Sequence, residues 1–214
     1  MSNVVIGVLG GTGDQGRGLA RRLSMAGHRV IIGSRSADRA AAAAAELGGG
    51  IDGGLNNHCA AEADLVIAAI PWEGHKELLT QLAGPLAGKV VVDCVNPLGF
   101  DSHGAYPISV PEGSAAQQAA AVLPGSTVVG AFHHVSAQLL LDPDVDSMDL
   151  DVLVLSDDRA ASDLVIAIAG EIPGMRGVYG GRLRNCGQVE ALTANLVSIN
   201  RRYKAHAGIR ITDV

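Results

Sequence analysis

The 214-residue sequence predicts a doubly wound α/β fold, in which helices cover both faces of a parallel sheet. Short apolar runs rich in valine and isoleucine, such as Val4–Leu9, are typical of strands that are buried on both faces. Segments of helical period separate these runs, which is the alternation of βαβ units. Glycine is abundant, with 28 residues, as the many turns of such a fold require.

A glycine-rich turn follows the first strand directly. Gly11-Thr12-Gly13-Asp14-Gln15-Gly16 has the spacing G-x-G-x-x-G between a strand and a helix, which is the context of a Rossmann-like dinucleotide site. We expect Gly11 to supply a positive φ, Gly13 to admit a pyrophosphate, and Gly16 to let the helix lie close to the strand. The N–H groups at the helix start, with Asp14 and Gln15, then face the anion.

The end of the second strand indicates which dinucleotide binds. NAD-binding members of this fold place an acidic residue there for the ribose hydroxyls. This chain instead has Ser34 and Arg35 after Arg29–Gly33, with Arg39 close behind and the Thr12 hydroxyl facing the same region. A guanidinium can form two hydrogen bonds to a 2′-phosphate that a carboxylate would repel. The sequence therefore predicts NADP(H).

Composition limits the remaining possibilities. Hydrophobic residues make up 48% and aromatic residues 3%, so the core must be aliphatic. The formal net charge of −6 argues against general nucleic-acid binding. No apolar stretch is long enough to cross a bilayer, and the first residues predict a strand instead of a signal peptide, so we expect no membrane partner. Cys59, Cys94 and Cys186 lie far apart in the sequence, so we expect free thiols. Free thiols are typical of a reducing compartment, and we therefore expect a cytoplasmic protein.

Further elements follow from caps and periodicity. Ser36 is expected to cap a helix that ends at 48–50, and Asn57 to cap a short helix that ends near Ala63. Ser114 opens a capping box. We expect strands at 64–70, 89–93 and 127–132, a helix from about 75 to 83, and a loop over 98–113 that is either a functional lid or a surface excursion.

The predicted site gathers where strands end, because ligands of such sheets bind beyond the carboxyl ends of the strands. This rule selects Ile70-Pro71-Trp72, Val95-Asn96-Pro97 and the segment that begins at His133. A lone histidine is more often a hydrogen-bonded structural residue than a functional one, but its place at a strand end makes the two readings of His133 equally good.

The acidic, proline-containing stretch 141–146 predicts a boundary or hinge between domains 1–141 and 142–214. Beyond it we expect a strand over 152–155, a helix over 158–170 and a long final helix. That last helix carries an apolar face, which would cover either the sheet or a second subunit; we favour a homodimer. The face consists of Val189, Leu192, Leu196, Ile199 and Tyr203. Arg201, Arg202 and Lys204 are expected in solvent.

Two familiar kinds of catalytic group are missing from the sequence. None of the three tyrosines precedes a lysine at Tyr-x-x-x-Lys spacing, so the proton relay of short-chain carbonyl reductases is absent. No metal-binding cluster is legible, since the side chains of His133 and His134 would point in opposite directions on an extended segment. An oxidoreductase without an acid or base fits hydride transfer between two redox rings, which needs stacking and orientation.

These features together resemble the NADPH-dependent oxidoreductases of the 8-hydroxy-5-deazaflavin coenzyme F420. The likeness runs along almost the whole chain and is most specific in 69–73 (Ala-Ile-Pro-Trp-Glu) and 114–116 (Ser-Ala-Ala). It also includes 10–13, 33–35 and the segment from Asp151 onward. The resemblance implies reversible hydride transfer between NADP(H) and the deazaflavin, a small α+β C-terminal domain that closes the cleft, a homodimer and a cytoplasmic location.

The resemblance also implies roles for individual residues. It assigns the 2′-phosphate to Thr12, Ser34, Arg35 and Arg39; the pyrophosphate to Gly13, Asp14 and Gln15; the nicotinamide to Ile70, Pro71, Asn96 and Ala137; and the deazaflavin to Asn96, Pro97, His133 and Ser136. An NADP-dependent imine or small-carbonyl reductase and a non-catalytic NADP(H) sensor are the alternatives. The first builds its pocket from a long, all-helical C-terminal domain, whereas a strand is expected here beyond residue 150.

Overall fold

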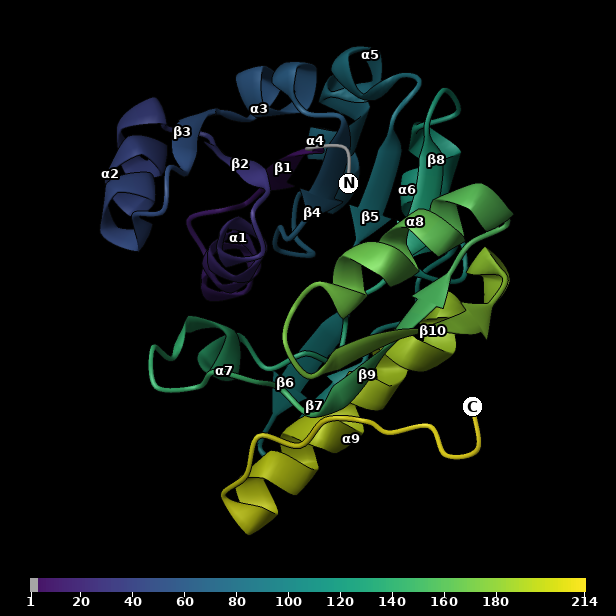
Figure 1. The fold of residues 1–214 in the computed structure, drawn as a ribbon. Helices are drawn as coiled ribbons and strands as arrows, with labels where there is room; N and C mark the ends of the chain where they lie inside the picture. The colour runs from purple at the N-terminus through teal and green to yellow at the C-terminus, as the bar shows by residue number, and fades with distance from the viewer. Residues whose placement is uncertain (1–3) are drawn as a thin grey trace.

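The computed structural model describes residues 4–214 and contains an eight-stranded sheet in the order β10-β9-β8-β5-β4-β1-β2-β3 (Figure 1). Its strands are β1 (Val5–Leu9), β2 (Arg29–Ser34), β3 (Asp52–Leu55), β4 (Leu65–Ala68), β5 (Val90–Asp93), β8 (Thr127–Gly130), β9 (Leu150–Leu155) and β10 (Met175–Gly181). A separate hairpin consists of β6 (Leu98–Asp101) and β7 (Gly104–Pro107). The helices are α1 (Asp14–Met25), α2 (Ala37–Leu47), α3 (Asn56–Glu62), α4 (His75–Gln81), α5 (Ala83–Leu86), α6 (Ala115–Val122), α7 (Ala137–Leu141), α8 (Arg159–Gly170) and α9 (Cys186–Tyr203).

The sheet confirms the predicted doubly wound α/β class. β1 to β5 and β8 pair in parallel, so their carboxyl ends meet at one edge. The C-terminal segment extends this sheet: β9 runs antiparallel to β8, joined through the pair Gly130 and Leu155, and β10 runs parallel to β9. The predicted C-terminal strand and helix are therefore present as β9 and α8. However, β9 and β10 extend the first sheet instead of forming a separate one. A domain boundary at 141–142 stays a prediction.

Two aliphatic cores lie on the two faces of the sheet. Alternate residues of a buried strand face opposite sides, so Val30 and Ile32 of β2 enter one core while Ile31 enters the other. The first core receives α1, α2, α7 and α8, and the second receives α3 to α6 and α9. The many alanines of α2 and α6 allow these helices to lie close to the sheet.

A buried arginine fixes the short helix α7 against α1. Arg22 donates hydrogen bonds to the carbonyl oxygens of Leu139 (2.8 Å), Leu140 (2.9 Å) and Asp142 (3.1 Å). These carbonyls lie at the C-terminal end of α7, where a cation is favourable. Burial, followed by the neighbouring Arg21, lowers the pKa of Arg22. Gly18 allows the close approach, because a Cβ there would lie 2.5 Å from Leu140 Cβ.

Three local predictions differ from the structure. Asn57 does not cap α3, which begins at Asn56 after Leu55 and has no side-chain cap. The segment 98–113 is only partly a loop, because β6 and β7 pair in an antiparallel hairpin that packs against α9. The glycine-rich strand β10 was not foreseen, since glycine is depleted in strands and its pairing with β9 decides the conformation. No helix among residues 4–214 is both long and apolar enough to cross a membrane.

Candidate functional site

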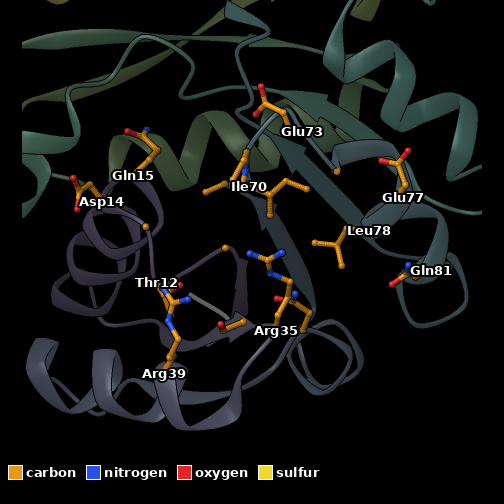
Figure 2. A pocket seen from close by; sticks show the side chains of 17 residues that line it. Thr12, Asp14, Gln15, Arg35, Arg39, Ile70, Glu73, Glu77, Leu78 and Gln81 are labelled. Atoms are coloured by element: carbon orange, nitrogen blue, oxygen red, sulfur yellow. The ribbon is translucent and has the colours of Figure 1, made fainter.

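A cleft of ≈ 620 Å³ lies beyond the carboxyl ends of β1, β2 and β4 (Figure 2). Its lining includes the predicted residues Thr12, Gly13, Asp14, Gln15, Ser34, Arg35, Arg39, Ile70 and Pro71. It also includes residues that sequence reasoning missed: Gly10, Asn56, Ala69, Glu73, Gly74, Glu77, Leu78 and Gln81. Asn56 and Ala69 each follow a strand directly, so the strand-end rule could have found them.

The glycine loop forms the floor of this cleft, with one change from the predicted roles. Gly10, not Gly11, has the positive φ, +71°. Gly11 is required for a different reason, because a Cβ there would lie 2.5 Å from Ile32 Cβ. Gly16 allows close packing as predicted, although its contact is with the loop: its Cβ would lie 2.7 Å from the Gly10 carbonyl oxygen. A Cβ on Gly13 would find no protein atom closer than 3.6 Å and would enter the cleft instead.

The start of α1 offers hydrogen-bond donors to an anion. The first helical bond joins the Arg17 N–H to the Gly13 carbonyl oxygen at 2.8 Å, so the N–H groups of Asp14, Gln15 and Gly16 have no partner within the helix. A carboxylate would repel a pyrophosphate, so Asp14 can contribute only its N–H group. The Gln15 side chain is used elsewhere, since its Nε2 donates to the Phe132 carbonyl oxygen at 3.2 Å.

Two guanidinium groups form the cationic end of the cleft. The Arg35 side chain extends into the cleft, and the Arg39 side chain runs from α2 toward Thr12 (Figure 2). Both are exposed, and neither side chain forms an ion pair or hydrogen bond with the rest of residues 4–214. The side-chain oxygen of Ser36 accepts the Arg39 N–H at 3.4 Å, which confirms the predicted cap. Together with Ser34, this end can hold a phosphate dianion.

The opposite wall of the cleft comes from α4 and the segment before it. Leu78 presents an apolar surface, with Glu77 and Gln81 beside it and Glu73 at the far end (Figure 2). Buried Ile70 and exposed Pro71 continue the apolar lining. The cleft therefore has cationic groups at one end and an apolar stretch at the other, which suits an elongated ligand with a phosphate at one end and a planar ring at the other.

The other predicted site residues do not line this cleft. Asn96 is half-buried, and its Nδ2 donates to the His133 carbonyl oxygen at 2.7 Å, while Pro97 next to it is buried. Ser136 caps α7 by accepting the Leu139 N–H at 3.5 Å, and Ala137 begins that helix. Ser136 and Ala137 line a second cavity of ≈ 510 Å³ together with residues of α9 and the segment after it: Val197, Asn200, Lys204, Ala205 and His206.

The structure gives no support for a direct contact between the His133 ring and a ligand, because the side chain is 0% exposed. Neither ring nitrogen has a hydrogen-bond partner among the described residues, and Nε2 lies 4.0 Å from Glu190 Oε1. Burial lowers the pKa of His133 to about 4, so the ring is neutral near pH 7. Its neighbour His134 is also buried and accepts the Leu153 N–H at 3.3 Å, which ties this segment to β9.

A buried carboxylate connects α9 to α6. Glu190 accepts the N–H groups of Ala115 at 2.9 Å and Ala116 at 3.2 Å, at the first turn of α6. Burial raises the pKa of Glu190 to about 7, although these two bonds act against the shift. Sequence reasoning missed this contact, because the bonded residues are 74 and 75 positions apart and glutamate is common on exposed helix faces.

The described part of the chain offers neither a candidate metal site nor an activated thiol. No group of three or more His, Cys, Asp or Glu side chains there could hold a metal ion. All three cysteines are free and buried, as expected from the sequence. Burial raises the pKa of Cys59 to about 12 and also raises the pKa values of Cys94 and Cys186, so none is an activated nucleophile.

Comparison with known proteins identifies similar chains. Residues 5–97 match the family model described as NADP oxidoreductase, coenzyme F420-dependent. The F420-dependent NADP reductase of Methanothermobacter thermautotrophicus is 38% identical, over 98% of this chain and 95% of its own length. The enzyme of the same name from Methanocaldococcus jannaschii is 38% identical over 98% of both chains. A crystal structure of a candidate F420-dependent NADP reductase from Arthrobacter sp. FB24 superposes with a TM-score of 0.84 and 28% identity, covering 98% of this chain and 99% of that one.

Proposed function

Because the chain belongs to the family of F420-dependent NADP reductases, we propose that it transfers a hydride reversibly between NADP(H) and the deazaflavin coenzyme F420. In this reaction NADPH, the oxidised deazaflavin and one proton give NADP⁺ and the reduced deazaflavin. The observation that carries the proposal is the cleft beyond β1, β2 and β4, with a glycine loop on its floor and two exposed guanidinium groups where NAD-binding proteins have a carboxylate.

The residues of the cleft fit NADP(H). Arg35 and Arg39, with the hydroxyl groups of Ser34 and Thr12, would bind the 2′-phosphate. The N–H groups at the start of α1 would bind the pyrophosphate, and the space above Gly13 admits it without a steric clash. Glu73 and Glu77 lie on the wall opposite the glycine loop, so their negative charges are not beside the site proposed for the pyrophosphate (Figure 2).

The reacting rings would meet at the apolar end of the cleft. In line with the family resemblance, Ile70, Pro71, Asn96 and Ala137 would flank the nicotinamide. Asn96, Pro97 and Ser136 would lie near the second ring. The two bound coenzymes supply the hydride donor and acceptor. The protein's own tasks are therefore to bind them, to hold the rings at reacting distance and to exclude water, without an acid or base from a side chain.

We further propose that residues 142–214 act as a unit that closes the cleft, and that the protein is a cytoplasmic homodimer. The end of α9 leaves large apolar side chains in solvent, with exposed fractions of 38% for Val197, 39% for Ile199 and 73% for Tyr203. Ile199 and Tyr203 are four positions apart and share one face of the helix, and such an exposed apolar pair favours contact with a second copy. Three buried free thiols favour a reducing compartment. Analytical ultracentrifugation tests the dimer.

A spectrophotometric assay tests the activity. The visible absorbance of oxidised F420 should disappear rapidly when the protein and NADPH are added, and only slowly with NADH at the same concentration. Bleaching with neither nucleotide, in a preparation that binds NADPH, would contradict the proposal and favour the imine-reductase or sensor alternatives. Equal bleaching with both nucleotides would contradict the assignment of the 2′-phosphate site. Heat-denatured protein serves as the control.

A further inference from the structure

His75, the first residue of α4, lies at the centre of a buried hydrogen-bond network. Its side chain and that of Asp93 are both 0% exposed, and Nε2 lies 2.7 Å from Asp93 Oδ2. Its Nδ1 lies 3.0 Å from Gln118 Oε1. The Nε2 of Gln118 donates to the Glu112 carboxylate at 3.2 Å, which directs Oε1 of this amide toward His75. Both ring nitrogens therefore face acceptors, the arrangement that suits an imidazolium.

The charged groups around His75 agree with this protonation state. Burial lowers its pKa, but the hydrogen bond to Asp93 on β5 and the charge of Asp93, the hydrogen bond to Gln118 Oε1 and the charge of Glu190 on α9 raise it, and the net shift is upward. A buried ion pair contributes little net stability compared with apolar residues of equal volume, whereas it restricts the local arrangement. A role in positioning is therefore a better account of this pair than a role in stability.

Asp93 connects His75 to the ends of the neighbouring strands. Its second oxygen, Oδ1, accepts the Val95 N–H at 3.1 Å and so shapes the turn that leads to Asn96. Asn96 in turn donates to the His133 carbonyl oxygen. These side-chain bonds, linked through the backbone from Val95 to Asn96, thus join the start of α4, the end of β5 and the segment after β8. These are the three segments around the proposed meeting point of the two rings.

His75 is also attached directly to the wall of the cleft. The backbone N–H of His75 donates to the Trp72 carbonyl oxygen at 3.1 Å. The imidazole and indole rings pack with centroids 5.6 Å apart. The residues between them, Glu73 and Gly74, line the cleft, as do Ile70 and Pro71 just before. Through the ring contact with Trp72, the position of the imidazole is therefore coupled to the segment 70–74.

We propose that His75 is a positioning residue for hydride transfer: through Asp93 and Trp72 it holds the 70–74 wall of the cleft in register with the ends of β5 and β8. This inference rests on the proposed function. His75 does not line the cleft, and it acts through the residues that do. The phosphate-binding end at Arg35 and Arg39 is separate from this network, so loss of His75 should affect the rate of transfer more than the binding of NADPH.

The experiment compares His75→Gln with His28→Gln. His28 is the control, because it also pairs with a carboxylate, the half-buried Glu171, but lies in the turn before β2, away from the lining of the cleft. For His75→Gln we expect kcat with F420 to fall about tenfold or more, since misplacement of reacting groups by ~1 Å can cost about a hundredfold, with the KM for NADPH nearly unchanged. The isotope effect on kcat with NADPH deuterated at the transferred position should increase. His28→Gln should lower the melting temperature and leave kcat unchanged.

A second readout does not depend on activity. Trp72 is the single tryptophan of the chain, so its emission reports the packing against His75. Emission should rise in His75→Gln, since a protonated imidazole quenches indole fluorescence, and stay constant in His28→Gln. If wild-type protein does not bleach F420, the proposed function fails; unchanged Trp72 emission in a folded His75→Gln variant would instead overturn the positioning role by itself.

Kinetics give the remaining decisive outcomes. An unchanged kcat in His75→Gln, or an equal loss of kcat in His28→Gln, would overturn the proposal. If the His75 variant does not fold, Gln118→Leu carries the same test, because it removes the bond to Nδ1 and leaves the pair with Asp93. A smaller fall in kcat with constant KM is then expected, and wild-type kcat would overturn the proposal.

Discussion

Removal of the two guanidinium groups from the cationic end of the cleft is the most direct test of coenzyme choice. We consider Arg35→Ala and Arg39→Ala, singly and together. Both side chains are exposed, line the cleft and form no bond with other described residues, so their loss should leave the fold intact. The buried hydroxyl of Ser34 and the N–H groups at the start of α1 would remain, and the variants should still bind the rest of NADPH.

The expected magnitude follows from the kind of bond that is lost. A hydrogen bond to a charged group contributes about 1.5–3 kcal/mol, and the lower end applies because both arginines are in contact with solvent. Since about 1.4 kcal/mol corresponds to a factor of ten, the KM for NADPH should rise roughly tenfold for each single variant. The double variant should lose somewhat less than the sum, because both groups bind one phosphate. NADH has no 2′-phosphate, so its KM should not change.

Initial rates of F420 bleaching over a range of NADPH and NADH concentrations measure both constants. Higher ionic strength should raise the KM for NADPH in the wild type and have less effect in the double variant, because salt screens exposed charges. Arg159→Ala on α8 is the control for loss of an exposed positive charge, since among residues 4–214 Arg159 pairs only with Asp163 on its own helix. The reasoning would be refuted if the KM for NADPH stayed at its wild-type value, or if the KM for NADH rose equally.

Two further predictions concern the glycine loop and the buried carboxylate. Gly13→Val should abolish NADPH binding in a calorimetric titration without lowering the melting temperature, because its side chain would enter the cleft; Gly11→Ala should lower the melting temperature, because its Cβ would meet Ile32. The reverse pattern would contradict the roles given to the two glycines. The raised pKa of Glu190, about 7, means that the folded protein holds this proton more tightly than the unfolded chain. The free energy of unfolding should therefore fall as pH rises from 5 to 7, relative to Glu190→Gln, in urea titrations; a constant difference would contradict this.

Patterns that repeat locally carried most of the fold prediction. Buried parallel strands need apolar runs, and the helices between them need an apolar stripe and caps, so both are visible within a short window of sequence. The caps at Ser36 and Ser114 were found in this way. The same local reasoning failed where a partner decides the structure: pairing with β9 makes a strand of the glycine-rich segment Met175–Gly181, and packing against α9 accompanies the hairpin at 98–107.

The candidate site, too, could be predicted only where its chemistry depends on residues close together in the sequence. The glycine loop and the Ser34-Arg35 pair could be located because their chemistry depends on residues close together in the chain. The sequence indicated that the loop needs glycine, but only the structure showed that Gly10 has the positive φ and that Gly11 must avoid Ile32. It also suggested His133 as a contact residue; the side chain is 0% exposed in the structure, and that role stays a prediction.

The sequence by itself determined the class of fold, and it predicted the place of the dinucleotide cleft and a phosphate at its cationic end. Each of these depends on residue type and on spacing within one βα unit. Only the tertiary structure decided which polar groups lie inside the protein and which partners they have. His75 with Asp93, Glu190 with the start of α6, and Arg22 with the end of α7 are pairs far apart in the chain. Their hydrogen bonds exist because the sheet brings distant segments together, and no local pattern records that proximity.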